Sequence, residues 1–71
     1  MVAATVRVWH AERGWGVLDS DETPGGCWVH FSSVQMDGFT GLTPGEQVEL
    51  EWEAAEQDKF RFRAIRVKPK A

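Results

Sequence analysis

Two short runs decide how this chain folds: residues 13–18 read Arg-Gly-Trp-Gly-Val-Leu, and residues 27–31 read Cys-Trp-Val-His-Phe. Successive side chains of a β-strand point to opposite faces of the sheet. If the two runs pair as a hairpin, one face carries four side chains from alternate positions, namely Trp15, Val17, Trp28 and His30. Flat rings exposed on a sheet face are unfavourable in water unless a flat partner covers them, and nucleobases are flat. The two runs therefore predict a surface on which bases stack.

The rest of the chain is typical of short strands separated by turns. Alternation and β-branched or aromatic content predict five strands, at residues 5–10, 15–20, 27–31, 48–53 and 60–67. Turn-forming residues occupy the intervening segments 11–14, 21–26 and 42–45. We expect one helical turn capped by a serine at residues 32–35 and an irregular loop at residues 36–41.

Five strands without a long helix predict an all-β fold, a five-stranded antiparallel barrel that forms one domain over residues 1–71. Closure of the barrel removes the exposed edges at which an open sheet would aggregate. In the fourth expected strand, apolar residues alternate with glutamates, which predicts an inward apolar face that includes Trp52. In the fifth, two phenylalanines share one parity, whereas Ile65 and Val67 have the other. A bulge near Ala64 would reconcile the two phases by inserting one extra residue.

The composition indicates a folded intracellular protein. Hydrophobic residues make up 42% of the 71 residues and charged residues 27%, which is ordinary for a globular domain and unlike a disordered chain. The single Cys27 has no disulfide or zinc partner, so we expect a small core residue in a reducing cytoplasm. No apolar run approaches the ~20 residues of a membrane span, and no secretory signal precedes the first strand.

The charges are segregated along the chain. The formal net charge of −3 argues against a general phosphate-binding protein, which would rely on many Lys and Arg contacts. Residues 46–58 contain six acids and no base, and residues 59–70 contain six bases and no acid. A hairpin that places Glu53 opposite Arg61 would place Glu51 opposite Arg63, at roughly 0.2–1 kcal/mol per pair. In that register three further bases extend beyond the acidic strand and remain available for phosphates, namely Arg66, Lys68 and Lys70.

Nothing in the sequence indicates an enzyme or a metal site. Ser32 and Ser33 follow His30 without an acid placed to orient the histidine, and no phosphate-binding or dinucleotide motif occurs. His30 also lacks the neighbouring ligands that a metal requires. We therefore expect no catalytic residue, no metal and no cofactor.

The two runs, their order and their spacing resemble the paired ribonucleoprotein motifs of the bacterial cold-shock domain, a five-stranded barrel of the oligonucleotide-binding fold. The similarity is strongest over residues 5–39 and looser as far as residue 67. The Val-His-Phe-Ser run that begins at Val29, the later Val-Gln, and Asp-Gly-Phe ending at Phe39 are similar to the family's third strand and following loop.

The resemblance implies binding of single-stranded RNA or DNA with little sequence preference. The positions that match ligand-contacting ones in the family are Arg7, Trp9, His10, Arg13, Trp15, Val17, Trp28, His30, Phe31 and Phe39. Strict alternation would instead send Phe31 inward with Cys27 and Val29. We expect a monomer without membrane or small-molecule partners.

Several departures from the family pattern bear on affinity. A Trp-Phe pair of the family appears here as Val8-Trp9, and the second ring of the glycine-ring-glycine motif appears as Val17, so two stacking rings are missing. Tryptophan replaces phenylalanine at Trp15 and Trp28, and the wider indole covers more of a base. His10 replaces an asparagine, and a Gly-Pro of the final connection is absent at residues 58–61.

Two hypotheses follow from these patterns. The first is an RNA chaperone of the cold-shock type, which traps unpaired bases on the aromatic face. The alternative is a protein-interaction module that docks a peptide or partner subunit on the same patch, because aromatic residues are also favoured at protein interfaces.

Overall fold

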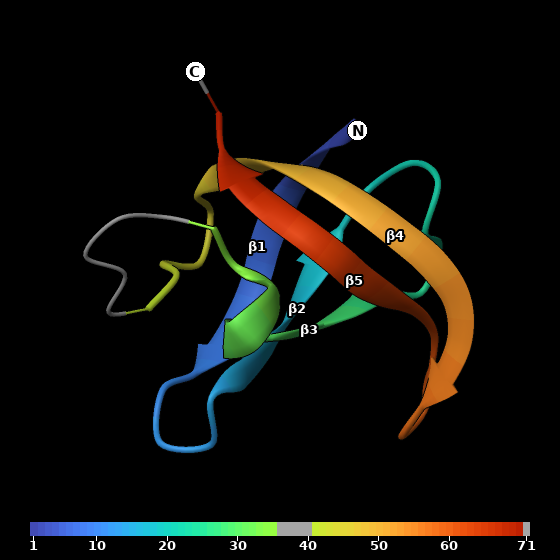
Figure 1. The fold of residues 1–71 in the computed structure, drawn as a ribbon, viewed down its shortest axis with the longest axis horizontal. Helices are drawn as coiled ribbons and strands as arrows, with labels where there is room; N and C mark the ends of the chain where they lie inside the picture. Colours follow the sequence, from blue (N-terminus) through green and yellow to red (C-terminus); the bar gives the residue numbers. More distant parts are fainter. Residues whose placement is uncertain (36–40, 71) are drawn as a thin grey trace.

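A computed structural model of the chain describes residues 1–35 and 41–70. It contains five strands and one short 3₁₀ turn: β1 (Val2–His10), β2 (Trp15–Asp19), β3 (Cys27–His30), η1 (Phe31–Ser33), β4 (Gln47–Gln57) and β5 (Phe60–Pro69). The strands close into a barrel in the order β1-β2-β3-β5-β4, and β4 pairs back with β1 (Figure 1). The predicted fold class, an all-β five-stranded barrel, is confirmed. The pairing of β3 with β5 is parallel, whereas the other neighbours are antiparallel.

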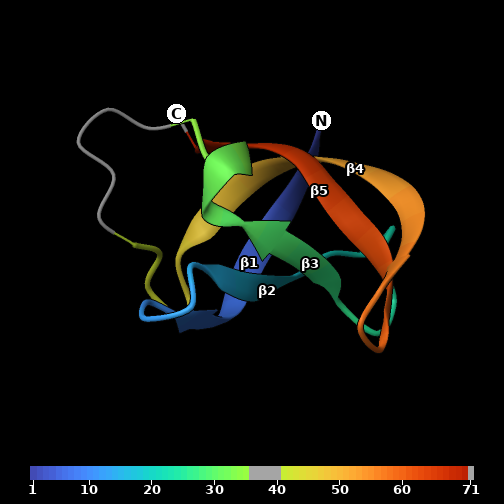
Figure 2. The same ribbon diagram turned by 60° about the horizontal axis from the view of Figure 1, so that its bottom comes forward.

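The longest strands are β4 and β5, which curve together around one side of the barrel and extend past the end of β3 (Figures 1 and 2). By contrast, β3 and β5 share only two residue pairs, Cys27 with Phe62 and Trp28 with Arg63. Beyond this short seam the chain leaves the sheet at η1, which Figure 2 shows beside β5. The Gln35 N–H then donates a hydrogen bond to the Val67 carbonyl oxygen at 2.8 Å, which fixes the segment after η1 to β5.

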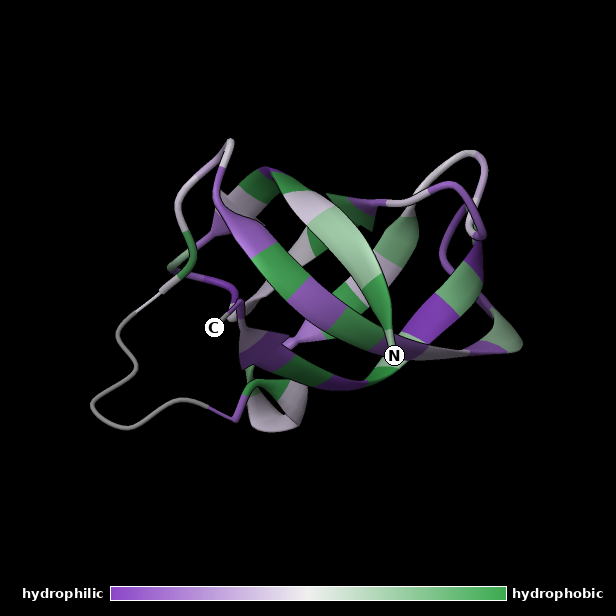
Figure 3. Ribbon diagram, turned by 90° about the horizontal axis from the view of Figure 1, so that it is seen from above, coloured by the Kyte–Doolittle hydropathy of each residue, from purple (hydrophilic) through white to green (hydrophobic). Residues whose placement is uncertain are grey.

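The core lies inside the barrel and follows the alternation of the strands, which is visible as alternating hydropathy in Figure 3. Its buried members are Ala4, Val6, Leu18, Cys27, Val29, Leu42, Val48, Leu50, Ala64 and Val67. The predicted inward face of β4 is confirmed for Val48 and Leu50, which are fully buried. The core position of Cys27 is confirmed as well, and burial raises the pKa of its thiol to about 12.

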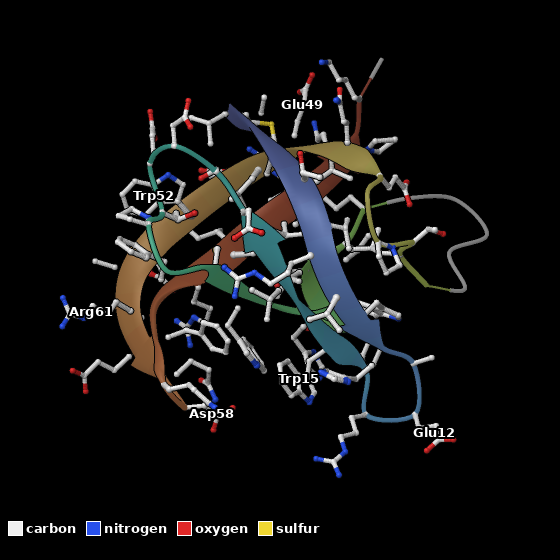
Figure 4. The ribbon with its side chains drawn as sticks, turned by 180° about the vertical axis from the view of Figure 1, so that it is seen from behind. Glu12, Trp15, Glu49, Trp52, Asp58 and Arg61 are labelled. Carbon is white, nitrogen blue, oxygen red and sulfur yellow. The ribbon has the colours of Figure 1, made fainter. Side chains whose placement is uncertain are left out.

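Trp52 lies at the edge of this core rather than inside it. Its ring packs against the cluster and meets Phe62 edge-on, with 5.2 Å between the ring centroids. Its indole Nε1 donates to Oε1 of Glu22 at 3.0 Å, so that β4 is tied to the loop between β2 and β3 (Figure 4). The predicted core role therefore holds only for part of the side chain.

Three register shifts interrupt the strand pairing, and two of them decide the positions of side chains that the sequence analysis discussed. In β5, Glu51 pairs with Arg66 and Trp52 with Ala64, so Ile65 is the extra residue of the predicted bulge. The bulge leaves Ile65 47% exposed, although it has the same parity as the fully buried Val67. In β1, a second register shift lies between Val6 and Val8 and makes Arg7 the extra residue there, a bulge that the sequence did not indicate.

The register of the β4–β5 hairpin differs from the predicted one. Glu53 lies opposite Arg63 and Glu51 opposite Arg66, and both pairs form ion pairs. Arg61, which is predicted to lie opposite Glu53, sits close to the end of the hairpin and points away from the barrel (Figure 4). The last bases do not extend beyond the acidic strand either: Lys68 pairs with Glu49, and Nζ of Lys70 donates to Oε1 of Gln47 at 3.1 Å.

Two further features concern residues 1–35 and 41–70 alone. No helix among them is long and apolar enough to cross a membrane. No three of their His, Cys, Asp or Glu side chains are grouped closely enough to hold a metal ion.

Candidate nucleic-acid interface

The predicted pairing of the two aromatic runs is confirmed. Trp15 lies opposite His30, and Val17 lies opposite Trp28, in the antiparallel ladder of β2 and β3. The β1 bulge at Arg7 adds a further ring, because it shifts the parity of the strand so that His10 lies opposite Trp15. Strict alternation along β1 would have grouped Arg7 with Trp9 and separated both from His10.

Five rings form a continuous row across β1, β2, β3 and the start of η1. We call these residues the ring row: His10, Trp15, Trp28, His30 and Phe31. The centroid distances between successive rings are 4.4, 6.3, 5.8 and 4.5 Å. The two central pairs, Trp15 with Trp28 and Trp28 with His30, are inclined by only 25° and 22°. Figure 4 shows Trp15 beside β2, away from Trp52 at the β2–β3 loop.

Phe31 ends the row because β3 stops one residue earlier than predicted. The chain turns into η1 at this residue, so the alternation that would have sent Phe31 inward no longer applies, and its side chain is 53% exposed. The ring lies against Gly14, and the Phe31 N–H donates to the Gly14 carbonyl oxygen at 2.8 Å. A Cβ at Gly14 would lie 2.9 Å from Cδ1 of Phe31, and the backbone φ at this residue is +76°. Both the close ring contact and the backbone conformation therefore require glycine.

His30 has a structural partner that the sequence did not indicate. The Ser32 N–H donates to Nδ1 of His30 at 3.3 Å, and Oγ of Ser32 lies 2.8 Å from the same nitrogen. His30 is thus the N-cap of η1, which corrects the predicted serine cap. Because Nδ1 accepts from a backbone N–H, the neutral ring carries its proton on Nε2, where it can donate to a base.

Val17 belongs to the predicted face but is only 2% exposed. Around Gly26 the side chains of Val17, Arg7 and Phe60 converge, since a Cβ at that glycine would lie 2.8, 3.1 and 3.2 Å from them. Val17 therefore supports Trp28 from the facing strand and leaves no surface for a base.

Trp9 packs against the core cluster at the other side of β1. Its indole covers two glycines: a Cβ at Gly16 would lie 2.6 Å from Cε3, and one at Gly41 would lie 3.1 Å from Nε1. The residue as a whole is half-buried. Phe39, the remaining predicted contact, lies outside the described residues.

The two predicted cations near the ring row differ in their partners. Nε of Arg7 donates to Oδ2 of Asp19 at 3.0 Å, and the two side chains form an ion pair. This hydrogen bond raises the pKa of Arg7 above its ordinary value. Arg13 is exposed in the β1–β2 turn and makes no ion pair with any residue that the structure describes. Of the two, Arg13 is the one whose charge is not already balanced.

One polar atom of the ring row has no partner. Nε1 of Trp28 is buried and finds no acceptor among the described residues, where no other buried side-chain nitrogen or oxygen shares this condition. A buried N–H without an acceptor costs about 1–3 kcal/mol.

The barrel and its ring row define a class of protein, the oligonucleotide-binding fold, in which the outer face of the second and third strands receives the ligand. Comparison with known proteins narrows the class. The family model described as the 'Cold-shock' DNA-binding domain matches residues 2–69. The chain belongs to this cold-shock domain family, a family of nucleic-acid-binding domains rather than enzymes.

Several bacterial relatives are similar over most of the chain. The major cold shock protein of Micrococcus luteus is 35% identical over 51 residues, which cover 72% of this chain and 76% of that protein. Cold shock protein CspC of Bacillus subtilis is 38% identical over 53 residues, covering 75% and 79%. Cold shock protein CspA of Staphylococcus haemolyticus is 37% identical over 51 residues, covering 72% and 76%.

Proposed function

We propose that this protein binds single-stranded RNA or DNA by stacking unpaired bases on the ring row and acts as an RNA chaperone. The observation that carries the proposal is the continuity of the row: five rings with successive centroid distances between 4.4 and 6.3 Å. Every base has a flat π face, so a row of rings accepts a strand with little regard to its sequence.

The rings supply the affinity, and Arg13 supplies a single contact to the phosphates. Stacking contributes about 1–3 kcal/mol per base by alanine substitution. The cations of β5 are paired with β4 carboxylates at Arg63 and Arg66, so they contribute little to attraction of the strand. Because binding depends on rings and few cations, the affinity falls only shallowly with salt. For a single strand, the slope of log K against log[salt] is about −0.7 per neutralised phosphate.

The chaperone mechanism is competition for unpaired bases. A base that lies on Trp15 or Trp28 cannot pair with another base, so the bound RNA does not form an incorrect double helix. Because each contact is weak and tolerant of sequence, the protein dissociates without an energy source. The resemblance implies rings at the positions of Val8 and Val17, and the valines there limit the number of bases held at once.

A fluorescence titration tests the proposal. Heptathymidine or a short unstructured RNA is added to the protein, and the tryptophan emission is followed; we expect saturable quenching, since Trp15 and Trp28 lie in the row. A duplex of equal length serves as the control and leaves the emission unchanged, because its bases are already stacked. Absence of quenching up to about 100 μM strand would refute nucleic-acid binding at this face.

That negative result would favour the alternative, a protein-interaction module. Phe31, at 53% exposure, would then be the anchor of a protein contact on the same surface.

A further inference from the structure

A cleft lies beside the ring row at the short seam between β3 and β5. It has a volume of about 460 Å³, which is within the range of sites that hold small molecules. Two rings of the row form one wall, and the β4–β5 hairpin forms the other. The lining side chains that matter here are Trp28, His30, Glu53, Gln57, Arg63 and Ile65. A nucleic-acid strand bound to the ring row can therefore place one base in the cleft while it still contacts Trp28 or His30.

The polar groups of the cleft form an unusual combination of acceptor and donor. Both contacts from the Arg63 guanidinium go to Oε2 of Glu53, through Nε at 3.0 Å and through a second nitrogen. Oε1 of Glu53 accepts no hydrogen bond from any described residue, so it remains available to a ligand. The pair is about half exposed, with 46% of the Arg63 side chain and 41% of the Glu53 side chain accessible.

Guanine matches this combination better than the other bases do. Its Watson–Crick edge presents two adjacent donors, N1–H and the N2 amino group, which a carboxylate accepts, and its O6 and N7 acceptors suit an arginine. Adenine and cytosine each offer one amino group beside an acceptor nitrogen, and thymine or uracil offers one N–H between two carbonyl oxygens. Those acceptors would face the negative charge of Glu53. The Glu53 carboxylate in the cleft therefore distinguishes guanine from the other bases, whereas the ring row stacks every base alike.

Trp28 provides an independent sign that a ligand belongs here. Its ring lines the cleft, and its buried Nε1 is the atom for which the described chain supplies no acceptor. A base carbonyl oxygen that enters the cleft and displaces the covering atoms would give this N–H an acceptor.

We propose that the cleft between β3 and the β4–β5 hairpin is a guanine subsite, in which Glu53 accepts hydrogen bonds from the base edge and Arg63 donates to it. The proposal rests on the proposed binding of single strands to the ring row. It adds a sequence preference at one nucleotide to a surface that is otherwise tolerant of sequence.

The test uses heptamers of thymidine in which one position carries guanine, adenine or hypoxanthine, scanned along the strand, with the corresponding uridine heptamers as a ribose series. The Kd of each is measured by tryptophan quenching. At one position we expect guanine to bind at least about fivefold tighter than adenine, in both series because the base edge is the same. Hypoxanthine, which lacks the N2 amino group, should fall between them.

Glu51 provides a matched control for Glu53. It also pairs with an arginine, through contacts of 3.0 and 2.7 Å from Arg66, at the same 41% exposure, but it does not line the cleft. We expect Glu53→Gln to reduce the guanine preference to within about twofold, and Glu51→Gln to retain it. Thermal unfolding of each variant confirms that both remain folded.

The outcomes separate this proposal from the proposed function. Equal binding of guanine and adenine at every position, with heptathymidine still bound, overturns the guanine subsite and leaves the ring row intact. If Glu51→Gln abolishes the guanine preference as fully as Glu53→Gln does, the subsite is also overturned. The preference would then depend on the net charge of the protein and not on a contact in the cleft. Failure of every heptamer to bind overturns both proposals.

Discussion

Replacing Trp28 with alanine removes the centre of the ring row and should weaken both the fold and the binding of a nucleic-acid strand. The Trp28 ring lies 6.3 Å from Trp15 and 5.8 Å from His30, centroid to centroid, so two ring pairs are lost. Each pair contributes about 0.5–1.5 kcal/mol beyond buried area, so the loss of the two ring contacts alone destabilises the fold by about 1–3 kcal/mol, before the buried area of this half-buried side chain is counted. Part of this is offset, because the change also removes the buried Nε1 that lacks an acceptor.

The loss in binding arises from the base that stacks on this ring. A base that loses its stacking platform loses about 1–3 kcal/mol, or roughly 5- to 150-fold in Kd. The assay is isothermal titration of heptathymidine into wild type and variant, which does not depend on the missing fluorophore. Urea unfolding of both proteins gives the change in stability separately.

Trp52→Ala is the control, since it makes the same chemical change away from the row. Trp52 packs edge-on against Phe62 and donates to Glu22, and we expect its loss to cost roughly 3 kcal/mol, the low end for Trp→Ala because the side chain is half-buried. The Kd should be unchanged while the variant is folded. If Trp28→Ala retains wild-type affinity, or if both variants lose affinity equally, the assignment of the ring row as the binding surface is wrong.

Four further measurements address the core, a glycine of strand β2, the buried thiol and an exposed charge. Leu50→Ala removes a fully buried side chain and should lower the unfolding free energy by about 2–5 kcal/mol in urea, a prediction that a loss below 1 kcal/mol would contradict. Gly16→Ala places a Cβ 2.4 Å from a carbonyl oxygen of β1, so we expect a loss of about 1–3 kcal/mol and a lower Tm. The pKa of Cys27 is raised to about 12, so the folded state favours the neutral thiol; this contribution to stability is complete below the ordinary thiol pKa and is lost as pH rises towards 12. Native protein at pH 8 should therefore react with a thiol reagent far more slowly than protein in urea, and equal rates would contradict the burial. Arg13→Ala should lower the salt dependence of log Kd by about 0.7, the contribution of one phosphate, and an unchanged slope would show that Arg13 does not contact the strand.

The sequence predicts the barrel and the pairing of β2 with β3 because both depend on alternation, which survives wherever a strand is regular. It does not predict the bulge at Arg7, since Val6 and Val8 share one parity and the apolar alternation continues unbroken across the bulge. The bulge near Ala64 was predictable because two apolar phases meet there. His10 therefore enters the ring row through a backbone irregularity that residue types alone do not reveal.

The end of β3 escaped prediction for a related reason. Successive side chains alternate between the two faces only while the strand continues. Because β3 ends at His30, the alternation assigns Phe31 to the wrong face. The signal that marks the stop is the His30–Ser32 contact, a cap formed by a residue type that is uncommon in that role. Gly14 fits the same geometry, because only glycine lets the Phe31 ring lie on the turn.

The register of the β4–β5 hairpin shows why charge could not decide it. Glutamates and bases each recur at every second position over part of their strands, so a register displaced by two residues again faces acids with bases. Glu53 would have met Arg61 instead of Arg63, with nearly the same gain, because an exposed ion pair contributes only about 0–1 kcal/mol. Apolar burial distinguishes the registers: the observed one sets Leu50 opposite Val67, both fully buried, at about 1.5–3 kcal/mol per side chain. Without a bulge, the displaced register would have set Val48, also fully buried, opposite the charged Arg66. The core therefore selects the register, and the ion pair that results is the one that places Glu53 and Arg63 together at the cleft beside Trp28.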